Sequence, residues 1–348
     1  MRIALCTVQV PFIRGGAESL CDGLYREMIK RGHEVEYIKI PFKWYPPNEI
    51  MNNSLVWRLL DLSESNGLKI DGVIATKFPS YLVKHRNKVV WLLHQHREAY
   101  DLAHTKFDDL ANIANGGEIV RKKIHSMDNK FLKESKKIYT ISGKVADRLW
   151  RYNQINGEVL YHPPPLNGRY YCESYGDYIF YPSRLDPKKR QDLFIRSMRY
   201  IKSDLRLKIA GTGPELSRYK DIAKECGVEE KVDFLGHVSD EELLDLYANA
   251  FCVAYLPIDE DLGYITLEAF LSKKPVITCS DSGGSLEFVD DGVNGHVVDP
   301  VPERLAERIN ALYEEESGSR MGEKGYKKII DMNLSWDNVI RKLVEPLT

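Results

Sequence analysis

The sequence lacks several features that would quickly assign the protein to a functional class. Its six cysteines are widely scattered and no two have metal-ligand or thioredoxin spacing, so free thiols in a reducing compartment are expected. No apolar run approaches the length of a membrane span, and residues 1–8 are typical of a strand rather than a signal peptide. The net charge of −2 offers no general attraction to nucleic acid. We therefore expect a cytoplasmic protein, with peripheral contact at the inner face of a membrane left open.

The patterns of two common cofactor sites are also missing. The first strand–helix turn has no Gly-x-Gly-x-x-Gly, and the turn at 211–214 is followed by leucine instead of the third glycine, which disfavours an NAD dehydrogenase. His94 and His96 have no third ligand nearby that would complete a zinc site. The tripeptide 259–261 is formally an Asp-x-Asp metal motif, but such tripeptides are common by chance. We expect neither a metal nor a cofactor.

Strand and helix patterns alternate along the chain, which predicts an α/β protein with parallel sheets covered on both faces. The predicted strands are 3–8, 35–40, 72–76, 89–93, 137–141, 158–161, 178–182, 205–210, 232–235, 251–256, 275–279 and 295–298. The predicted helices are 17–31, 117–136, 144–151, 189–201, 215–226, 240–249 and 302–315, with another opened by Gly263. Residues 43–65 and 97–116 fit no regular element, and we expect loops there.

Three consecutive prolines at 163–165 interrupt the alternation. Proline continues neither a helix nor a central strand, so this run is the natural linker between domains. A chain of 348 residues is long enough for two domains of ordinary size. The simplest architecture is therefore two doubly wound, Rossmann-like domains, 1–165 and 166–334, that face each other across a cleft.

The most informative segment contains two glutamates eight positions apart. Glu260 precedes the helix that Gly263 opens, and Glu268 lies about two turns into it. A helix N-terminus offers unpaired N–H groups to phosphate or sugar oxygens, and ionised carboxylates accept hydrogen bonds from hydroxyl groups. A double glycine follows at 283–284. Together these features favour a site for a hydroxyl-rich ligand over an exposed acidic loop.

This segment resembles the Glu-x7-Glu signature of retaining glycosyltransferases of family 4, which have the GT-B fold. The resemblance implies that Glu260 contacts the transferred sugar and that Glu268 binds the ribose of the nucleotide. It also implies that the backbone around Gly263, Tyr264 and Ile265 faces the donor.

A pair of basic residues follows the predicted strand 178–182. Arg184 and Lys189 lie just beyond its carboxyl end, where open parallel sheets bind ligands, and a guanidinium with an ammonium suits a pyrophosphate. The alternative is a solvated basic turn. Family 4 places an arginine and a lysine at this spacing to bind the donor diphosphate, which implies that role here. Ser183 stands where the family usually has glycine.

Two more turns of the second half resemble the family. The Gly-x-Gly-Pro turn that begins at Gly211 is common in it, although a turn that needs glycine flexibility explains this pattern equally well. Gly236 and His237 resemble the loop that contacts the base of the nucleotide, where the backbone usually reads the base.

In the first half, Gly15 and Gly16 precede a helix, and their amides are placed to approach a phosphate. A glycine turn needed for tight packing is the alternative, and the resemblance favours a loop that faces the donor. Family members typically carry one histidine after the strand predicted at 89–93, where it lines the sugar pocket. His94 follows that strand directly and is the first choice, with His96 second.

The resemblance implies a metal-independent enzyme that transfers a hexose, with retention, from a nucleotide-diphosphate sugar to a saccharide or lipid-linked acceptor in polysaccharide or glycoconjugate synthesis. The catalytic residues would be Glu260, His94, Arg184 and Lys189. The second domain would bind the donor, and the first would offer the acceptor. The final helix, 335–348, is expected to pack back on the first domain, as it does in this fold.

The run Asp-Glu-Asp-Leu-Gly at 259–263, together with His-Pro-Pro-Pro at 162–165, resembles bacterial and archaeal polysaccharide mannosyltransferases. This resemblance favours GDP-mannose as donor, with a UDP-sugar next. The basic stretch 121–137 is interpreted as a solvated helix face, or else as a face that meets anionic lipid. The rival functions are a nucleotide-sugar epimerase and a non-catalytic nucleotide-sugar-binding protein. A glycosidase is disfavoured because it needs no basic pair to bind a diphosphate.

Overall fold

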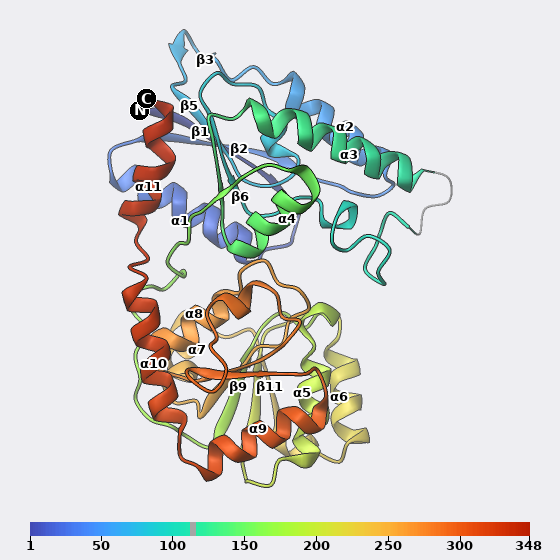
Figure 1. Ribbon diagram of the computed structural model, residues 1–348, viewed down its shortest axis with the longest axis vertical. Coiled ribbons are helices and arrows are strands. Elements are labelled where there is room, and N and C mark those ends of the chain that lie inside the picture. Colours follow the sequence, from blue (N-terminus) through green and yellow to red (C-terminus); the bar gives the residue numbers. More distant parts are fainter. Residues whose placement is uncertain (112–115) are drawn as a thin grey trace. The chain divides into compact units, whose positions relative to one another are not determined.

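The computed structural model describes residues 1–111 and 116–348. The chain divides into two compact units (Figure 1): unit 1 comprises Met1–Pro165 with Ser335–Thr348, and unit 2 comprises Leu166–Leu334. The division falls directly after the proline run, where three successive residues have no backbone N–H to donate.

Unit 1 contains a parallel sheet with the strand order β2-β1-β5-β6-β7-β8. The strands are β1 (Arg2–Gln9), β2 (Glu34–Pro41), β5 (Gly72–Ala75), β6 (Lys88–Leu92), β7 (Lys137–Thr140) and β8 (Glu158–Val159). A separate hairpin pairs β3 (Glu64–Ser65) with β4 (Leu68–Lys69). The chain runs from β1 outward to β2 and then returns to β5 on the other side of β1, so the topological switch point lies between β1 and β5.

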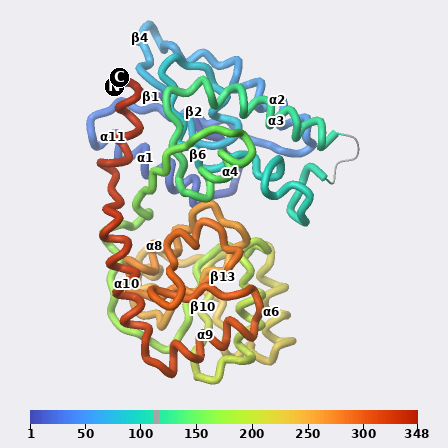
Figure 2. Tube along the Cα trace, in the orientation of Figure 1, coloured from blue at the N-terminus to red at the C-terminus, as the bar shows by residue number. Residues whose placement is uncertain are grey.

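The α-helices described beside this sheet are α1 (Gly16–Lys30), α2 (Asn48–Leu59), α3 (Gly117–Phe131), α4 (Gly143–Asn153) and α11 (Trp336–Val344). Leu20, Leu24 and Met28 recur at helical spacing and are the buried face of α1. The C-terminal α11 lies beside α1 (Figure 2), where the Trp336 ring would be 2.9 Å from a Cβ atom at Gly23. Glycine at this position therefore lets the two helices approach closely.

The prediction that 43–65 is irregular was wrong, because α2 occupies most of it. Ile50, Ser54 and Trp57 form the buried face of this helix at helical spacing. The central buried position is a serine whose hydroxyl donates to the Ile50 carbonyl at 2.7 Å. A polar residue in the middle of the stripe, among three asparagines, concealed the helical period. The predicted loop 97–116 begins with a 3-10 turn at Arg97–Ala99, and its residues 112–115 lie outside the described residues.

Unit 2 contains a second parallel sheet, with the order β11-β10-β9-β12-β13-β14. The strands are β9 (Tyr178–Pro182), β10 (Arg206–Ala210), β11 (Val232–Gly236), β12 (Cys252–Ala254), β13 (Val276–Cys279) and β14 (Gly295–Val298). The helices are α5 (Gln191–Ser197), α6 (Leu216–Glu225), α7 (Asp240–Ala248), α8 (Tyr264–Leu271), α9 (Pro302–Glu314) and α10 (Gly318–Asp331). Every predicted strand is present, and the α/β class with two doubly wound parallel sheets is confirmed.

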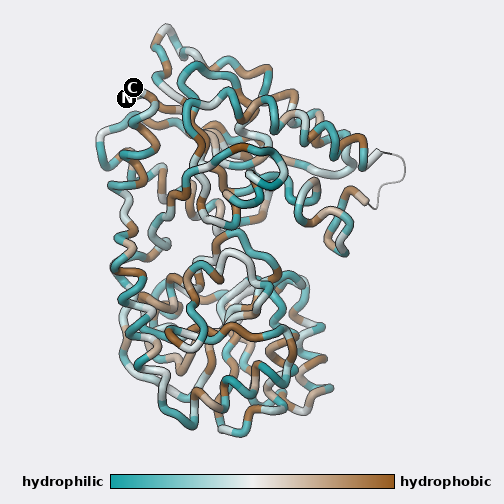
Figure 3. The backbone as a smooth tube through the Cα atoms, in the orientation of Figure 1, coloured by the Kyte–Doolittle hydropathy of each residue, from teal (hydrophilic) through white to brown (hydrophobic). Residues whose placement is uncertain are grey.

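The core of unit 2 is strongly apolar. Tyr181, Phe194, Ile209 and Ile277 are among its fully buried residues. Hydrophobic and hydrophilic residues alternate along the surrounding helices (Figure 3), as expected for helices with one face on a sheet.

Helix α10 was not predicted, because glycine is unfavourable inside helices and three glycines lie in it. Two of them allow close packing. A Cβ atom at Gly322 would be 1.8 Å from the Lys273 carbonyl oxygen, and one at Gly325 would be 2.2 Å from the Phe270 ring.

Candidate active site

Three loops of unit 2 are joined at the carboxyl edge of its sheet. The Ser183 N–H donates to the Ala210 carbonyl at 2.9 Å, and the Gly211 N–H donates to the Gly236 carbonyl at 2.7 Å. The loops that follow β9, β10 and β11 are therefore held together by backbone hydrogen bonds, which do not depend on the identity of the side chains. His237, the next residue on the third loop, is exposed.

The Gly-x-Gly turn is explained by packing. Gly211 has φ +140°, and a Cβ atom there would be 2.0 Å from the Ser183 carbonyl oxygen. A Cβ atom at Gly213 would be 2.2 Å from the Leu185 carbonyl oxygen. Glycine is thus required because two loops touch, and this supports the packing alternative for this turn.

The predicted basic pair lies at the same edge of the sheet. Arg184 is exposed, and among the described residues its guanidinium makes no hydrogen bond or ion pair. Lys189 is largely buried, with 16% of its side chain exposed, and its ammonium forms an ion pair with Glu260. The same ammonium donates to the hydroxyl of Tyr255 at 3.2 Å. The structure therefore brings the proposed phosphate cation and the proposed sugar carboxylate into direct contact.

The double glycine determines where Glu260 stands. The Gly284 N–H donates to the Glu260 carbonyl at 2.6 Å, and the Glu260 N–H donates to the Ser282 carbonyl at 3.2 Å. A Cβ atom at Gly283 would be 2.5 Å from the Glu260 carbonyl oxygen. Only glycine allows this approach, so the double glycine acts by fixing the loop that carries the carboxylate.

Helix α8 begins directly after Gly263, which has φ +84°. A Cβ atom there would be 2.7 Å from the Ser285 hydroxyl and 2.8 Å from the Tyr255 ring, so both the conformation and the space require glycine. Tyr264 and Ile265 form the first turn of the helix and are partly exposed. The predicted helix start is confirmed.

Glu268 lies inside the unit rather than on its surface. It is 9% exposed, and the Tyr247 hydroxyl donates to its carboxylate at 2.6 Å. Burial raises the pKa of Glu268, and the hydrogen bond from the Tyr247 hydroxyl acts in the opposite direction. The carboxylate thus accepts a hydrogen bond from a tyrosine of its own unit.

Tyr255 lies beside the ion pair of Lys189 and Glu260 and was missed by the sequence analysis. It is buried beside Lys189, and burial followed by the charges of Glu260 and Glu268 raises its pKa well above the usual value. Its place near the end of the predicted strand 251–256 was the available signal, since ligands bind beyond strand ends.

In unit 1, the amide of Gly15 already has an internal partner. Gly15 precedes α1, and its N–H donates to the Glu18 carboxylate at 2.9 Å. Glu18 in turn forms an ion pair with Lys77 at 2.6 Å. Gly16 is the first residue of the helix. The N-terminus of α1 is thus capped by a carboxylate that a nearby lysine compensates.

The two candidate histidines have different surroundings. His94 is partly exposed, and its Nδ1 atom is 2.9 Å from the Gln95 carbonyl oxygen. His96 is buried, with the rings of Phe42 and Phe78 at centroid distances of 6.3 and 5.6 Å. Burial lowers the pKa of His96. His94 is therefore the more accessible of the two.

The described residues form neither a cluster suited to a metal ion nor a helix suited to crossing a membrane. No group of three or more His, Cys, Asp or Glu side chains within 1–111 and 116–348 is arranged to hold a metal ion. In the same ranges, no helix has both the length and the apolar character needed to cross a membrane.

Comparisons with solved structures establish the fold class. The chain matches the crystal structure of HepE from Anabaena in complex with UDP and glucose, with a TM-score of 0.73, 17% identity, and coverage of 100% and 99% of the two chains. It also matches sucrose-phosphate synthase from Thermosynechococcus elongatus, with a TM-score of 0.77, 15% identity, and coverage of 99% and 97%. The fold is that of GT-B glycosyltransferases.

Comparisons of sequence show which proteins this chain is similar to. Residues 174–328 match the family described as glycosyl transferases group 1. The chain is 27% identical to an uncharacterized glycosyltransferase of Methanocaldococcus jannaschii, over 99% of this chain and 97% of that protein. It is 32% identical to a GDP-mannose-dependent alpha-(1-6)-phosphatidylinositol monomannoside mannosyltransferase of Mycobacterium tuberculosis, over 47% of this chain and 45% of that protein. By fold this chain is a glycosyltransferase of the GT-B type, and its sequence is similar to that of glycosyl transferases group 1 and of mannosyltransferases.

Proposed function

We propose that this protein is a retaining, metal-independent hexosyltransferase that uses a nucleotide-diphosphate sugar, with GDP-mannose as the first candidate donor and a UDP-sugar as the second. The acceptor is a saccharide or a lipid-linked saccharide. The mannosyltransferase relatives support the first donor, and the UDP bound to HepE supports the second.

The observation that carries the proposal is the contact between Lys189 and Glu260 at the carboxyl edge of the unit 2 sheet. A cation suited to phosphate and a carboxylate suited to sugar hydroxyls are adjacent, as the two sides of a sugar–phosphate bond require. The free guanidinium of Arg184 provides a second cation on the loop after β9. A glycosidase has no use for this pair of cations.

The proposed chemistry follows from these positions. As the bond between the anomeric carbon and the phosphate oxygen breaks, negative charge grows on the departing diphosphate, and Lys189 with Arg184 stabilises it. Glu260 accepts a hydrogen bond from the sugar, and Glu268 accepts from the ribose. The leaving phosphate oxygen takes the proton of the acceptor hydroxyl as the new glycosidic bond forms. His94 lines the sugar pocket.

The rival functions make different demands on the same residues. An epimerase would release free sugar and nucleotide without an acceptor. A non-catalytic binder would need the basic pair but not the sugar-side groups Glu260 and His94. The resemblance to mannosyltransferases favours transfer over both.

Peripheral contact with an anionic membrane surface through 121–137 stays part of the proposal for a lipid-linked acceptor. In that stretch, Lys122, Lys123, Lys130, Lys133 and Lys136 are exposed. By contrast, Arg121 is buried and forms an ion pair with Asp108 at 2.9 Å, so it belongs to the core side of the helix.

The role of Lys189 and Arg184 in diphosphate binding is tested by calorimetry. GDP and UDP binding is measured for wild type, Lys189→Ala and Arg184→Ala. Each substitution is expected to weaken diphosphate binding by about 2 kcal/mol, because a charge-assisted contact is lost. Binding of guanosine or uridine should change little. Lys220→Ala, an exposed lysine of α6, is the matched control. Equal losses for nucleoside and diphosphate would remove the basic pair from the diphosphate site.

A further inference from the structure

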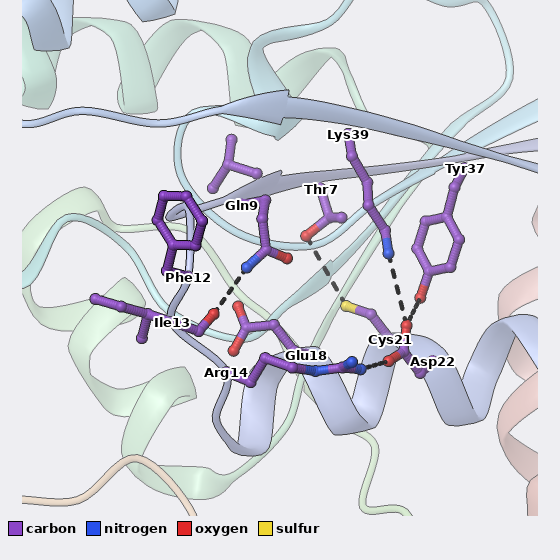
Figure 4. A pocket seen from close by; sticks show the side chains of 11 residues that line it. Thr7, Gln9, Phe12, Ile13, Arg14, Glu18, Cys21, Asp22, Tyr37 and Lys39 are labelled. Atoms are coloured by element: carbon purple, nitrogen blue, oxygen red, sulfur yellow. Dashed lines mark hydrogen bonds and ion pairs between the residues drawn. The ribbon is translucent and has the colours of Figure 1, made fainter. Parts of the chain in front are cut away.

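A pocket of about 380 Å³ opens in unit 1, and the proposed donor chemistry does not use it (Figure 4). It lies at the carboxyl ends of β1 and β2, beside the first turns of α1. Its size falls within the range of about 300–1,000 Å³ that is typical of small-molecule sites. The side chains that decide its chemistry are Gln9, Phe12, Arg14, Asp22, Tyr37 and Lys39.

Asp22 is the centre of the polar wall. It accepts a hydrogen bond from Arg14 at 2.5 Å and one from the Tyr37 hydroxyl at 3.1 Å. The ammonium of Lys39 lies 3.6 Å from the same carboxylate and 3.8 Å from the centre of the Tyr37 ring. These contacts, which Figure 4 shows, place donors and acceptors side by side along one wall.

Every charged side chain that lines the pocket has an ionic partner. Its lining contains two cations, Arg14 and Lys39, and two carboxylates, Glu18 and Asp22. Each cation is already within reach of Asp22, and Glu18 is paired with Lys77. An anionic ligand would have to compete with Asp22 for either cation of the lining. Hydroxyl groups both donate and accept hydrogen bonds, so a neutral polyol suits this wall better than a phosphate.

The rim of the pocket is apolar and unusually exposed. Phe12 is fully exposed and has φ +65°, a left-handed conformation that costs a non-glycine residue about 1–2 kcal/mol. Gln9 holds this loop, since its side-chain amide donates to the Val10 and Ile13 carbonyls at 2.9 and 2.8 Å. Strained residues of this kind cluster at ligand sites. An aromatic face beside a polar wall matches a sugar ring, which has apolar C–H faces and polar edges.

The position of the pocket separates it from the switch point of the sheet. The pocket lies on the β2 side of β1, whereas the switch point lies between β1 and β5. Glu18 is shared between the two places, because it lines the pocket, caps Gly15, and pairs with Lys77 after β5.

We infer that this pocket binds a neutral saccharide unit of the acceptor, with Phe12 against the sugar ring and the Asp22 cluster on its hydroxyl groups. The inference rests on the proposed function, since it names the acceptor side of the same enzyme.

The test measures sugar binding to the full chain by saturation-transfer NMR. The probes are the methyl α-glycosides of mannose, glucose and galactose, and N-acetylglucosamine. At least one should bind to wild type, and Phe12→Ala and Asp22→Asn should each weaken it by about tenfold or more. Ile29→Ala, which removes another exposed apolar side chain of unit 1, should leave it unchanged. Circular dichroism confirms the fold, and Phe12→Ala keeps the test decisive if Asp22→Asn unfolds.

Three results would overturn the inference. These are no binding of any probe, binding that both pocket variants retain, and displacement of the sugar by inorganic phosphate, which would mark an anion site. Calorimetry of GDP and UDP binding to the same samples distinguishes failure of the pocket inference from failure of the proposed function. Nucleotide binding without sugar binding would refute only the inference about the pocket. Absence of nucleotide binding would refute the proposed function.

Discussion

The two units organise the carboxyl edges of their sheets in different ways. In unit 2, the loops that carry Ser183, Gly211 and Glu260 are joined by backbone hydrogen bonds and by glycines that touch a neighbouring carbonyl. In unit 1, buried side chains make many of the contacts that join the corresponding loops. Asp128 accepts from the hydroxyls of Tyr81 and Tyr100 at 2.9 and 2.7 Å, and from the Gln95 amide at 3.1 Å.

The difference has a physical consequence. Backbone hydrogen bonds do not titrate between pH 4 and 8, whereas the unit 1 network contains a fully buried carboxyl group. The loop contacts of unit 2 are therefore insensitive to pH but intolerant of a Cβ atom at Gly211 or Gly283. Unit 1 should respond to pH through this carboxyl group.

The largest effect is expected for Gly211→Ala. Its Cβ atom would be 2.0 Å from the Ser183 carbonyl oxygen at a φ of +140°, so the free energy of unfolding should fall by about 3 kcal/mol. Gly227→Ala is the matched control, because Gly227 has φ +66° and open space around it, and should cost about 1 kcal/mol. Denaturant unfolding measures both. Equal losses would mean that loop contact does not decide the role of Gly211.

A smaller effect is expected from Asp128→Asn. Burial raises the pKa of Asp128 from 3.8 to about 6, so the folded state keeps a proton that the unfolded state releases. This contribution to stability is present below pH 4 and is lost as the pH rises through 6, an effect on the order of 2 kcal/mol.

Asparagine carries no such proton. The stability of wild type minus that of Asp128→Asn should therefore fall between pH 4 and 6, as measured by denaturant unfolding at several pH values. Other carboxyl groups shift the individual curves and cancel in the difference. A difference that stays flat over this range would show that Asp128 is not the titrating group.

How far the sequence predicted the structure also differs between the units. In unit 2 the informative signals were local: Arg184 and Lys189 follow a strand, and Gly263 opens a helix. Local signals of this kind can be interpreted from spacing alone. The glycines at 283–284 were recognised as part of the motif, although their contact with the Glu260 loop needed the structure.

What the sequence could not predict depends on long-range contact. The Asp128 network joins residues 28 to 47 positions apart, and no pattern in the chain marks them as neighbours. The place of Tyr255 in the site could not be predicted, because Lys189, which contacts it, lies 66 positions away in the sequence. The pocket around Asp22 brings the ends of two strands and a helix together in the same way.

The assignment of the two glutamates is the central claim, and it is tested most directly by the affinity for bare nucleotide. Calorimetry compares GDP and UDP binding to wild type, Glu260→Gln and Glu268→Gln. Tyr247→Phe removes the hydroxyl that contacts Glu268 while keeping its carboxylate, and it separates loss of packing from loss of a ribose contact.

We predict that Glu268→Gln weakens binding of bare nucleotide, because the ribose contact is present without a sugar. Glu260→Gln should bind nucleotide normally yet lose turnover, because its contact exists only when the sugar is bound. The opposite pattern, with Glu260→Gln unable to bind nucleotide and Glu268→Gln unaffected, would contradict the assignment of both residues.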